Sequence, residues 1–367
     1  MLRRLVISGG GTGGHIFPAI AIADAVKDKD PSVEILFVGA EGKMEMERVP
    51  AAGYRIVGLP IAGIQRRLSL ENLRLPFRLF RSMKKAAAVL REFAPDAVVG
   101  VGGYASGPVL WQAARRGIPT VIQEQNSFAG LTNRWLGKRV DKICVAYKGM
   151  DAFFPEGKIL FTGNPVRKDL RDIDRLKDEA MRHYGLRAEL PTLLVFGGSL
   201  GARVLNEEMR QSLQLFGASR GVQLIWATGR AQFDAYRERL GALPEGVVLL
   251  PFLERMDLAY AAADLVVCRA GALTLSELAV VGRPAILVPS PYVTADHQTH
   301  NARAFEQVGA AVMVAESEAP GTLAQTALEL LRNEPGLDFL REKMTGQASS
   351  TAAQMIADLL FQMAEKN

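Results

Sequence analysis

Cysteine is scarce in this sequence, and long apolar runs are missing. The chain of 367 residues has 2 cysteines, Cys144 and Cys268, and both lie in apolar stretches typical of buried strands. Two such thiols favour core packing in a reducing compartment over a disulfide framework. No stretch approaches the roughly 18 consecutive apolar residues of a membrane-spanning helix, and the first apolar run is too short for a signal peptide. We therefore expect a cytosolic protein without a membrane span.

Negative charge is scarce in the N-terminal half. Residues 1–166 contain 23 Lys and Arg against 14 Asp and Glu, whereas the remainder contains 21 against 25. Most of the excess lies in residues 61–91, with eight basic residues and one acidic residue. This imbalance indicates an anionic partner, whether phosphate, anionic lipid or nucleic acid.

Short strand-like runs alternate with segments of helical periodicity along the whole chain. The sequence predicts strands at 3–8, 33–38, 54–59, 97–101, 119–122, 142–146, 192–196, 222–226, 247–250, 264–268, 284–288 and 311–314, with helices at 15–28, 69–91, 202–215 and 320–332. Such alternation predicts an α/β fold with parallel sheets. Because 367 residues exceed one compact core, we expect two doubly wound, Rossmann-like domains, 1–163 and 164–367, that face each other across a cleft.

Five glycines crowd the loop from Gly9 to Gly14, between the first predicted strand and a helix. The spacing fits G-x-G-x-x-G, in which main-chain N–H groups and a helix N-terminus bind a diphosphate. A tight turn without ligand and a dinucleotide site are the alternatives, but the acidic residue that would bind a dinucleotide's ribose is not clearly present. His15 follows, where its imidazole can act as a general base, cap the helix or bind phosphate.

Two loops of the C-terminal half also follow predicted strands and contain glycines that could bind a phosphate. The loop 197–202 has glycines around Ser199, whose hydroxyl can donate to a phosphate oxygen. A second loop, 269–277, follows the strand-like run DLVVC. There Thr274 and Glu277 have the spacing of a helix capping box; alternatively, Glu277 accepts hydrogen bonds from two ribose hydroxyls.

The segment 289–301 is polar, and it follows a predicted strand. Gln298 and Asn301 are candidates to bind sugar hydroxyls. Asp296, His297 and His300 suggest a metal site, but no further ligand lies at a suitable spacing. The D-x-D triplets at 28–30 and 172–174 do not end a buried strand. We therefore predict no obligatory metal and no cofactor.

Polar residues also follow two predicted strands of the first half. Tyr104 lies in a glycine-rich loop, 102–108, and Glu124 and Asn126 come directly after an apolar strand. Ligands of open α/β sheets bind at the carboxyl ends of the strands. These positions therefore indicate a second site, for a phosphate-bearing ligand, rather than surface loops.

The basic stretch 61–91 interleaves apolar and cationic side chains. A helix of this kind can lie on anionic lipid; a core helix with a basic outer face and a nucleic-acid site are the alternatives. Its phenylalanines lie among leucines rather than on a stacking platform, so we expect no nucleic acid. The patch predicted to contact lipid comprises Leu73, Leu75, Phe77, Arg78, Leu79, Phe80, Arg81 and Lys85.

Several motifs, taken together and in order, are similar to one family. They are GGGTGGH at 9–15, GVGGYASGP at 100–108, EQN at 124–126, GLTN at 130–133, GNPVR at 163–167, GGSLGAR at 197–203 and CRAGALTLSE at 268–277. With them the chain resembles the MurG family of glycosyltransferase family 28, the N-acetylglucosaminyltransferases of bacterial peptidoglycan synthesis. The resemblance implies a GT-B fold and an inverting, metal-independent transfer of GlcNAc from UDP-GlcNAc to the 4-hydroxyl of undecaprenyl-pyrophosphoryl-MurNAc-pentapeptide (lipid I), giving lipid II.

The resemblance also assigns residues. It implies His15 as the candidate base, with Glu124 and Tyr104 on the acceptor side, and the backbone near Leu253 against the uracil. The implied donor contacts are Thr12, Gly13, Gly14, Asn126, Arg167, Ser199, Leu253, Ala272, Leu273, Thr274, Leu275, Ser276, Glu277 and Gln298. His297 stands where relatives have a glutamine, which leaves the sugar contacts there open.

The expected setting is the cytoplasmic face of the plasma membrane, where a peripheral protein contacts anionic lipid and serves cell-wall biogenesis, cell shape and cell division. We also expect the last helix, about 350–367, to pack back on the N-terminal domain. The rival functions are a UDP-GlcNAc 2-epimerase of the same fold, an NAD oxidoreductase, and a non-catalytic nucleotide or lipid-surface binder. The sequence indicates no particular protein partner or oligomeric state.

Overall fold

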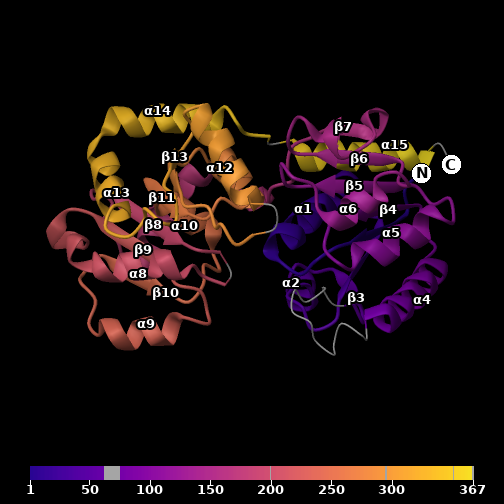
Figure 1. Cartoon of the computed structure of the whole chain (residues 1–367), viewed down its shortest axis with the longest axis horizontal. Coiled ribbons are helices and arrows are strands. Elements are labelled where there is room, and N and C mark those ends of the chain that lie inside the picture. The colour runs from indigo at the N-terminus through magenta and orange to yellow at the C-terminus, as the bar shows by residue number, and fades with distance from the viewer. Residues whose placement is uncertain (62–74, 199, 294–295, 350, 366–367) are drawn as a thin grey trace. The chain divides into compact units, whose positions relative to one another are not determined.

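The chain forms two units, each built on one parallel sheet (Figure 1). This computed structural model describes residues 1–61, 75–198, 200–293, 296–349 and 351–365. The N-terminal unit comprises Met1–Arg167 and Ser349–Asn367, and the C-terminal unit comprises Lys168–Ala348. The boundary predicted after residue 163 differs from this division, which assigns the GNPVR segment to the N-terminal unit.

The sheet of the N-terminal unit has the strand order β3-β2-β1-β4-β5-β6-β7, and all its neighbouring strands are parallel. Its strands are β1 (Arg4–Ser8), β2 (Glu34–Ala40), β3 (Arg55–Leu59), β4 (Ala97–Gly100), β5 (Thr120–Glu124), β6 (Lys142–Val145) and β7 (Ile159–Phe161). Its helices are α1 (Gly13–Lys29), α2 (Glu45–Ala51), α4 (Leu75–Phe93), α5 (Ser106–Ala114), α6 (Leu131–Leu136) and α15 (Ala352–Glu365).

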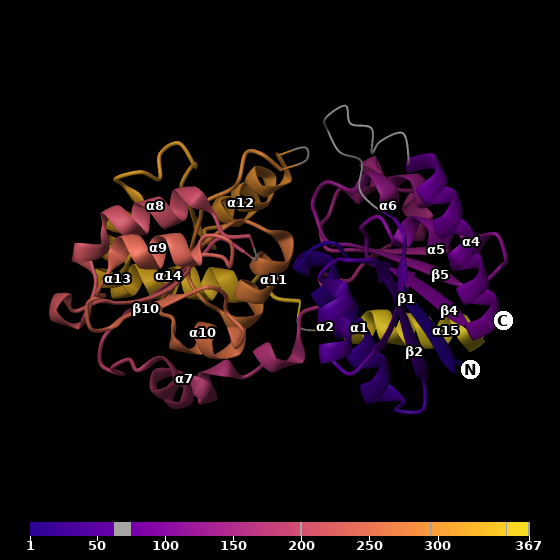
Figure 2. The ribbon, with the colours of Figure 1, turned by 90° about the horizontal axis from the view of Figure 1, so that it is seen from below.

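Alternate residues of β1 face two different cores. Leu5 and Ile7 pack with residues of α1 and α15, whereas Val6 packs with residues of α4 and α5. Figure 2 shows α1 and α15 on one face of the sheet and α4 and α5 on the other. A parallel sheet covered on both faces needs strands that are apolar throughout, which is why these strands read as continuous Val, Ile and Leu runs.

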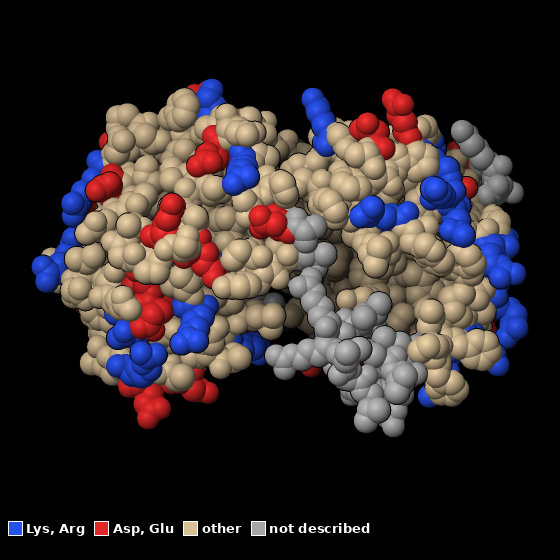
Figure 3. All heavy atoms as spheres, viewed as in Figure 1, with Lys and Arg blue, Asp and Glu red and all other residues tan. Residues whose placement is uncertain are grey.

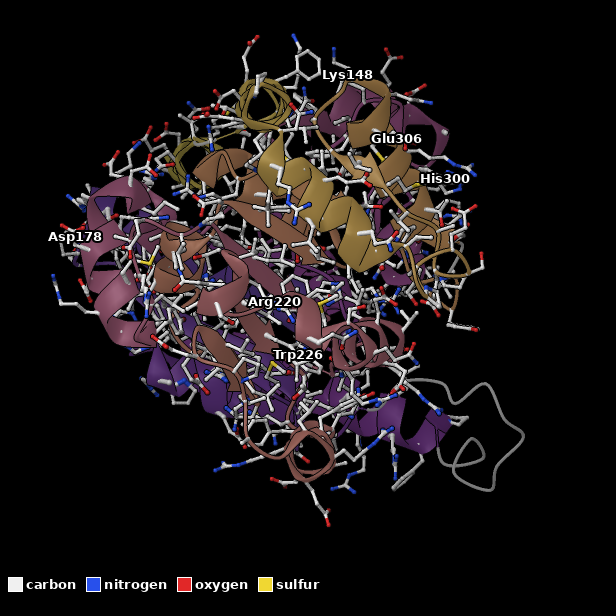
Figure 4. All side chains as sticks on the ribbon, turned by 90° about the vertical axis from the view of Figure 1, so that its left-hand side faces the viewer. Lys148, Asp178, Arg220, Trp226, His300 and Glu306 are labelled. Atoms are coloured by element: carbon white, nitrogen blue, oxygen red, sulfur yellow. The ribbon has the colours of Figure 1, made fainter. Side chains whose placement is uncertain are left out.

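The C-terminal unit repeats this plan with the strand order β10-β9-β8-β11-β12-β13. Its strands are β8 (Thr192–Phe196), β9 (Gln223–Ala227), β10 (Val247–Leu250), β11 (Leu265–Cys268), β12 (Ala285–Leu287) and β13 (Val312–Met313). Its helices are α7 (Lys177–Tyr184), α8 (Arg203–Gln211), α9 (Phe233–Leu240), α10 (Met256–Ala262), α11 (Ala272–Val281), α12 (His297–Gln307), α13 (Leu323–Arg332) and α14 (Glu334–Thr345). Trp226 of β9, labelled in Figure 4, is fully buried in the core of this unit.

Short 3-10 helices connect some of these elements. In the N-terminal unit they are η1 (Met150–Ala152) and η2 (Glu156–Lys158), and in the C-terminal unit η3 (Lys168–Leu170), η4 (Ile173–Leu176), η5 (Leu213–Leu215) and η6 (Ala218–Arg220). No described helix is long and apolar enough to cross a membrane.

All the predicted strands overlap strands of the structure, with ends that differ by at most two residues. The sequence did not predict β7, a three-residue edge strand whose residues are not buried. The helix predicted from residue 69 is described from Leu75, and residues 62–74 lie outside the described residues. The last helix, α15, contacts α1 within the N-terminal unit.

In each sheet the chain adds strands first in one direction and then in the other. The change falls between β1 and β4 in the N-terminal sheet and between β8 and β11 in the C-terminal sheet. Chain connections leave these two neighbouring strands toward opposite sides, and ligands of open α/β sheets bind at this switch point. The glycine-rich loops 9–14 and 197–202 follow β1 and β8. Each unit therefore has one predicted phosphate loop at its own switch point.

Candidate active site

The loops after β1 and β4 pack against each other at the carboxyl edge of the N-terminal sheet. A Cβ atom built on Gly103 would lie 2.4 Å from the carbonyl oxygen of Gly10, and one on Gly9 would lie 2.2 Å from Cγ2 of Val101. Gly103 also has a φ of 83°, which residues with a side chain rarely adopt. These glycines are therefore required for loop packing, whether or not a ligand binds there.

His15 lies in the first turn of α1, partly buried against the loop after β4. Its Nδ1 is 3.1 Å from the carbonyl oxygen of Gly10 and 3.4 Å from Oγ1 of Thr12. A carbonyl oxygen only accepts hydrogen bonds, so the contact with Gly10 requires the proton on Nδ1. Nε2 then carries the lone pair, and a Cβ atom on Gly102 would lie 2.9 Å from it. The contacts thus assign Nε2 as the basic nitrogen.

Burial is the largest influence on His15, and it lowers the imidazole pKa below the ordinary value of 6.5. The carboxylates of Glu124 and Glu45 and the hydrogen bond to Gly10 act in the opposite direction, but burial prevails. His15 is therefore neutral at neutral pH, and its Nε2 can accept a proton. This is the state that a general base requires.

Glu124, at the end of β5, is almost fully buried. Its Oε1 accepts hydrogen bonds from the backbone N–H of Asn126 at 3.1 Å and from Nδ2 of the same residue at 3.2 Å. Its Oε2 accepts from the N–H of Gly130 and from Nδ2 of Asn133, both at 2.9 Å. Four donors therefore engage this carboxylate, which holds the loop between β5 and α6 in place.

Asn133, which donates to Glu124, faces the same glycine as His15, and the Glu124 carboxylate acts to raise the imidazole pKa. A Cβ atom on Gly102 would lie 3.7 Å from Nδ2 of Asn133. The roles predicted for Glu124 and Tyr104 in binding the acceptor stay predictions. Tyr104 lies in the same loop as Gly102, and 53% of its surface is exposed.

The donor contacts predicted in the N-terminal unit lie near the start of α1 and after β5. Thr12, Gly13 and Gly14 form the N-cap and first turn of α1, and Asn126 is fixed beside Glu124. The guanidinium of Arg167 lies 4.6 Å from the ring of Phe17 on the same helix. A cation held in this way sits near the helix N-terminus that would meet a phosphate.

Glu45 is a residue of this site that the sequence analysis missed. It opens α2, is 1% exposed, and accepts hydrogen bonds from the N–H of Gly11 at 2.8 Å and of Ala40 at 2.9 Å. In the sequence Glu45 is one of three acids among residues 41–47 and stands out in no way, because only the folded chain brings residues 11, 40 and 45 together. The N–H of Gly11 therefore serves a carboxylate within the protein rather than a phosphate.

The glycine loop of the C-terminal unit packs against the loop after β9. A Cβ atom on Gly201 would lie 2.0 Å from the carbonyl oxygen of Thr228. That carbonyl also accepts a hydrogen bond from Nδ2 of Asn206 at 2.9 Å, and Oδ1 of Asn206 accepts from Nε1 of the buried Trp226 at 2.9 Å. A buried polar network therefore fixes the loop after β8. Ser199, predicted to bind phosphate, lies outside the described residues.

Helix α11 begins at Ala272, with Gly271 as its N-cap residue. The capping-box alternative for Thr274 and Glu277 is therefore excluded, because Thr274 lies inside the helix and Glu277 is one turn further on. Glu277 is 5% exposed, and its Oε2 accepts a hydrogen bond from the hydroxyl of Tyr260 at 3.2 Å. Tyr260, which the sequence presents as a core residue of α10, is a second partner that the sequence analysis missed.

The remaining predicted residues of this unit lie at the same carboxyl edge. Gln298, in the first turn of α12, accepts a hydrogen bond from the N–H of Ser290 at 2.9 Å, and Asn301 donates to the carbonyl of Ala270 at 3.2 Å. Leu253 follows β10 and is buried. The backbone of Ala272–Glu277, after β11, belongs to this edge too.

No group of three or more His, Cys, Asp or Glu side chains is placed to bind a metal ion within the described ranges. His300, labelled in Figure 4, is exposed on α12, and Asp296 accepts a hydrogen bond from the hydroxyl of Thr299 at 2.7 Å. These residues therefore do not form the metal site weighed from the sequence.

The outer face of α4 combines exposed rings with cations. Ser82, Ala86 and Leu90 form its buried side, whereas Phe77 and Phe80 are 63% and 56% exposed. Leu79 is 49% exposed. This spacing places the two phenylalanines on the side of the helix that faces away from the core.

Cations of α4 lie directly against these rings. Arg81 is 5.9 Å from the ring centre of Phe77, and Lys84 is 4.6 Å from that of Phe80. Figure 3 shows Lys and Arg side chains gathered along this edge of the unit. Of the other patch residues, Arg78 is partly buried, Lys85 pairs with Glu41 at 2.9 Å, Leu73 lies outside the described residues, and of Leu75 only the backbone is described.

Comparison with known proteins defines the class to which these two units belong. Residues 5–145 match the N-terminal domain of glycosyltransferase family 28, and residues 192–359 match the C-terminal domain of the same family. The chain therefore belongs to glycosyltransferase family 28, and its two parallel-sheet units are those of the GT-B fold.

Several curated relatives match nearly the whole chain. A protein of Parabacteroides distasonis named UDP-N-acetylglucosamine--N-acetylmuramyl-(pentapeptide) pyrophosphoryl-undecaprenol N-acetylglucosamine transferase is 50% identical over 366 residues, 99% of each chain. A protein of the same name from Cytophaga hutchinsonii is 48% identical and covers 98% of this chain and 96% of its own. The crystal structure of Acinetobacter baumannii MurG superposes with a TM-score of 0.74 at 29% identity, covering 98% of this chain and 99% of that one.

A UDP-GlcNAc 2-epimerase from Neisseria meningitidis also superposes, with a TM-score of 0.68 over 100% of this chain and 100% of its own, but at 12% identity. A likeness at that level shows the fold alone.

Proposed function

We propose that this protein transfers GlcNAc from UDP-GlcNAc to the 4-hydroxyl of the MurNAc of undecaprenyl-pyrophosphoryl-MurNAc-pentapeptide. The observation that carries the proposal is the near-full-length likeness to relatives named for this transfer. The neutral His15, with Nε2 as its basic nitrogen, supports the proposal further, because a neutral imidazole can take the proton of an attacking sugar hydroxyl. The product supplies cell-wall synthesis, on which growth and division of a bacterial cell depend.

In this mechanism Nε2 of His15 removes the proton of the acceptor hydroxyl. The hydroxyl oxygen forms a bond to the anomeric carbon of GlcNAc from the face opposite UDP. The bond between that carbon and the phosphate oxygen breaks, and UDP leaves with the electron pair. One displacement of this kind inverts the configuration of the anomeric carbon. Glu124 and Tyr104 lie on the acceptor side in this proposal.

The departing diphosphate is stabilised by main-chain N–H groups and a helix N-terminus, without a metal ion or cofactor. Helix α11 starts at Ala272 without an acidic residue in its first turn, so the positive end of its dipole is available to an anion. Glu277 binds the ribose hydroxyls, and the backbone near Leu253 lies against the uracil. The further donor contacts proposed are Thr12, Gly13, Gly14, Asn126, Arg167, Ser199, Ala272 to Ser276, and Gln298.

The outer face of α4 binds the anionic surface of the membrane on which the lipid-linked acceptor resides. Phe77 and Phe80 supply exposed apolar surface, and Arg81 and Lys84 lie against their rings. An amphipathic helix with these features lies in the interface between headgroups and acyl chains. The protein is therefore peripheral, at the cytoplasmic face of the plasma membrane.

Product analysis tests the proposal. The purified protein is incubated with UDP-GlcNAc, with and without lipid I, and with a chelator in a parallel sample. We expect a disaccharide-linked lipid and UDP only when the acceptor is present, and no effect of the chelator. Release of an epimerised sugar without acceptor would indicate the 2-epimerase function, and binding of UDP-GlcNAc without turnover would indicate a non-catalytic protein. If manganese restored the activity of a chelated sample, the transfer would not be metal-independent.

A further inference from the structure

One peptide group joins a buried carboxylate to the imidazole of the active site. The N–H of Gly11 donates to Oε2 of Glu45 at 2.8 Å, and the carbonyl oxygen of Gly10 lies 3.1 Å from Nδ1 of His15. These two atoms belong to the same peptide group, because the carbonyl of residue 10 is bonded to the nitrogen of residue 11. A continuous series of hydrogen bonds therefore runs from Glu45 through this peptide to His15.

Close packing holds the members of this series in place. A Cβ atom on Gly10 would lie 2.2 Å from Oε1 of Glu45, and one on Gly39 would lie 2.5 Å from its Cγ, so both positions must be glycine to admit the side chain. Ala40 donates its N–H to Oε1 of Glu45 at 2.9 Å. On the opposite side Gly103 packs against the backbone of Gly10. Close packing and two backbone hydrogen bonds therefore hold the carboxylate against this peptide.

We propose that Glu45 is a positioning residue that fixes His15 as the tautomer protonated on Nδ1. This inference rests on the proposed function, in which Nε2 of His15 is the base. A carboxylate that accepts from a peptide N–H polarises that peptide and makes its carbonyl a stronger acceptor. The carbonyl of Gly10 then holds the Nδ1 proton of His15 more firmly and leaves the lone pair on Nε2. The arrangement does what an aspartate does for a catalytic histidine, with a peptide group placed between the two side chains.

Charge strengthens the same effect during the reaction. When Nε2 takes the proton of the acceptor, His15 becomes a cation, which nearby negative charge stabilises. Two carboxylates raise the pKa of His15, that of Glu124 from β5 and that of Glu45 from α2. Loss of the Glu45 charge therefore lowers the pKa of His15 further and makes Nε2 a weaker base.

The test replaces the carboxylate by an amide of the same size, Glu45→Gln. Glu47→Gln is the matched control, because Glu47 is an exposed residue on the same short helix. The first readout is the imidazole tautomer of His15 from long-range nitrogen–proton NMR correlations of ¹⁵N-labelled protein. The chain contains 4 histidines, so a His15→Gln sample assigns the signal.

For the wild type and for Glu47→Gln we expect Nδ1 to be protonated and Nε2 to be bare. In Glu45→Gln we expect a mixture of tautomers, a lower titration midpoint of His15, and an acid limb of kcat/KM displaced to lower pH. Turnover of a soluble acceptor should fall about tenfold or more, as part of the roughly 10²- to 10⁴-fold that a general base supplies is lost. KM for UDP-GlcNAc should change little.

A wild-type His15 protonated on Nε2 would overturn the inference, and this measurement needs no variant to fold. So would a folded Glu45→Gln protein whose tautomer, titration and turnover match those of Glu47→Gln. If Glu45→Gln does not fold, Glu45→Asp, which keeps the charge but shortens its reach, takes its place with the same expectations for tautomer and turnover. A wild-type protein without transferase activity would contradict the proposed function instead, and the NMR result would still decide whether Glu45 sets the tautomer.

Discussion

Reversing the charges of Arg78, Arg81 and Lys84 to glutamate tests whether the outer face of α4 binds anionic lipid. Each cation near the surface contributes about 1 kcal/mol, so the loss of all three costs about 3 kcal/mol before any repulsion by the new carboxylates. Because about 1.4 kcal/mol corresponds to a factor of ten, binding should weaken at least about a hundredfold. Lys85 is left unchanged, since its ammonium pairs with Glu41 at 2.9 Å.

The assay is co-sedimentation with vesicles that contain phosphatidylglycerol, compared with vesicles of phosphatidylcholine alone. The control reverses Arg182, Arg220 and Arg332, which are exposed on the C-terminal unit, and it should bind like the wild type. Turnover of a soluble acceptor should survive in both triple variants. Unchanged binding of the α4 variant, or an equal loss in the control, would refute the assignment of the lipid-binding surface to α4.

The remaining predictions concern the two sites. The acid limb of kcat/KM should lie below pH 6.5, because burial lowers the pKa of His15 and activity falls as the imidazole gains its proton. His15→Ala should abolish this acid limb and most of the turnover but leave UDP binding intact. Tyr260→Phe removes a hydrogen bond of 3.2 Å to Glu277 and should raise KM for UDP-GlcNAc about tenfold, since a hydrogen bond to a charged group is worth about 1.5 kcal/mol or more; an unchanged KM would dismiss this contact. Gly103→Ala should lower turnover and should lower the free energy of unfolding by about 1–3 kcal/mol. Gly117→Ala is the control, because Gly117 has a φ of 71° but open space around it; it should lower the free energy of unfolding less and leave turnover unchanged. Equal losses of stability in melting experiments would mean that backbone conformation alone is responsible.

The sequence was sufficient to predict every strand except β7, and the loops at the carboxyl ends of those strands. Strands buried on both faces must be apolar throughout, so runs such as 97–100 and 265–268 are visible without any long-range information. In the structure, the glycine-rich loops predicted after the first strand of each half follow β1 and β8, at the switch point of each sheet. The expected loops and the observed ones agree because both depend on residues that are neighbours in the chain.

Residues that act through distant neighbours were not predictable in this way. Glu45 has the appearance of an exposed helical charge, and its burial depends on glycines at positions 10 and 39 that leave room for it. Tyr260 reads as an ordinary core residue of α10, since nothing local shows that its hydroxyl meets Glu277. Spacing also allowed a capping box at Thr274 and Glu277, which the structure excludes, because residue spacing alone does not show where a helix begins.

The same limit applies to the first glycine loop, which the sequence presents as a phosphate site. In the structure one of its N–H groups is bound to the carboxylate of Glu45, and its neighbouring carbonyl is bound to His15. The glycines of this loop therefore also organise a base. A pattern of glycines indicates that the backbone closely approaches another group, but it does not show whether that group is a ligand or a side chain of the protein.

The anomeric configuration of the product tests the central claim most directly. The account requires a single displacement at the anomeric carbon, with Nε2 of His15 as the base and no covalent intermediate. Proton NMR of the disaccharide formed from UDP-GlcNAc, in which GlcNAc is α-linked, should therefore show a β-linkage to the 4-oxygen of MurNAc. An α-linked product would contradict this mechanism.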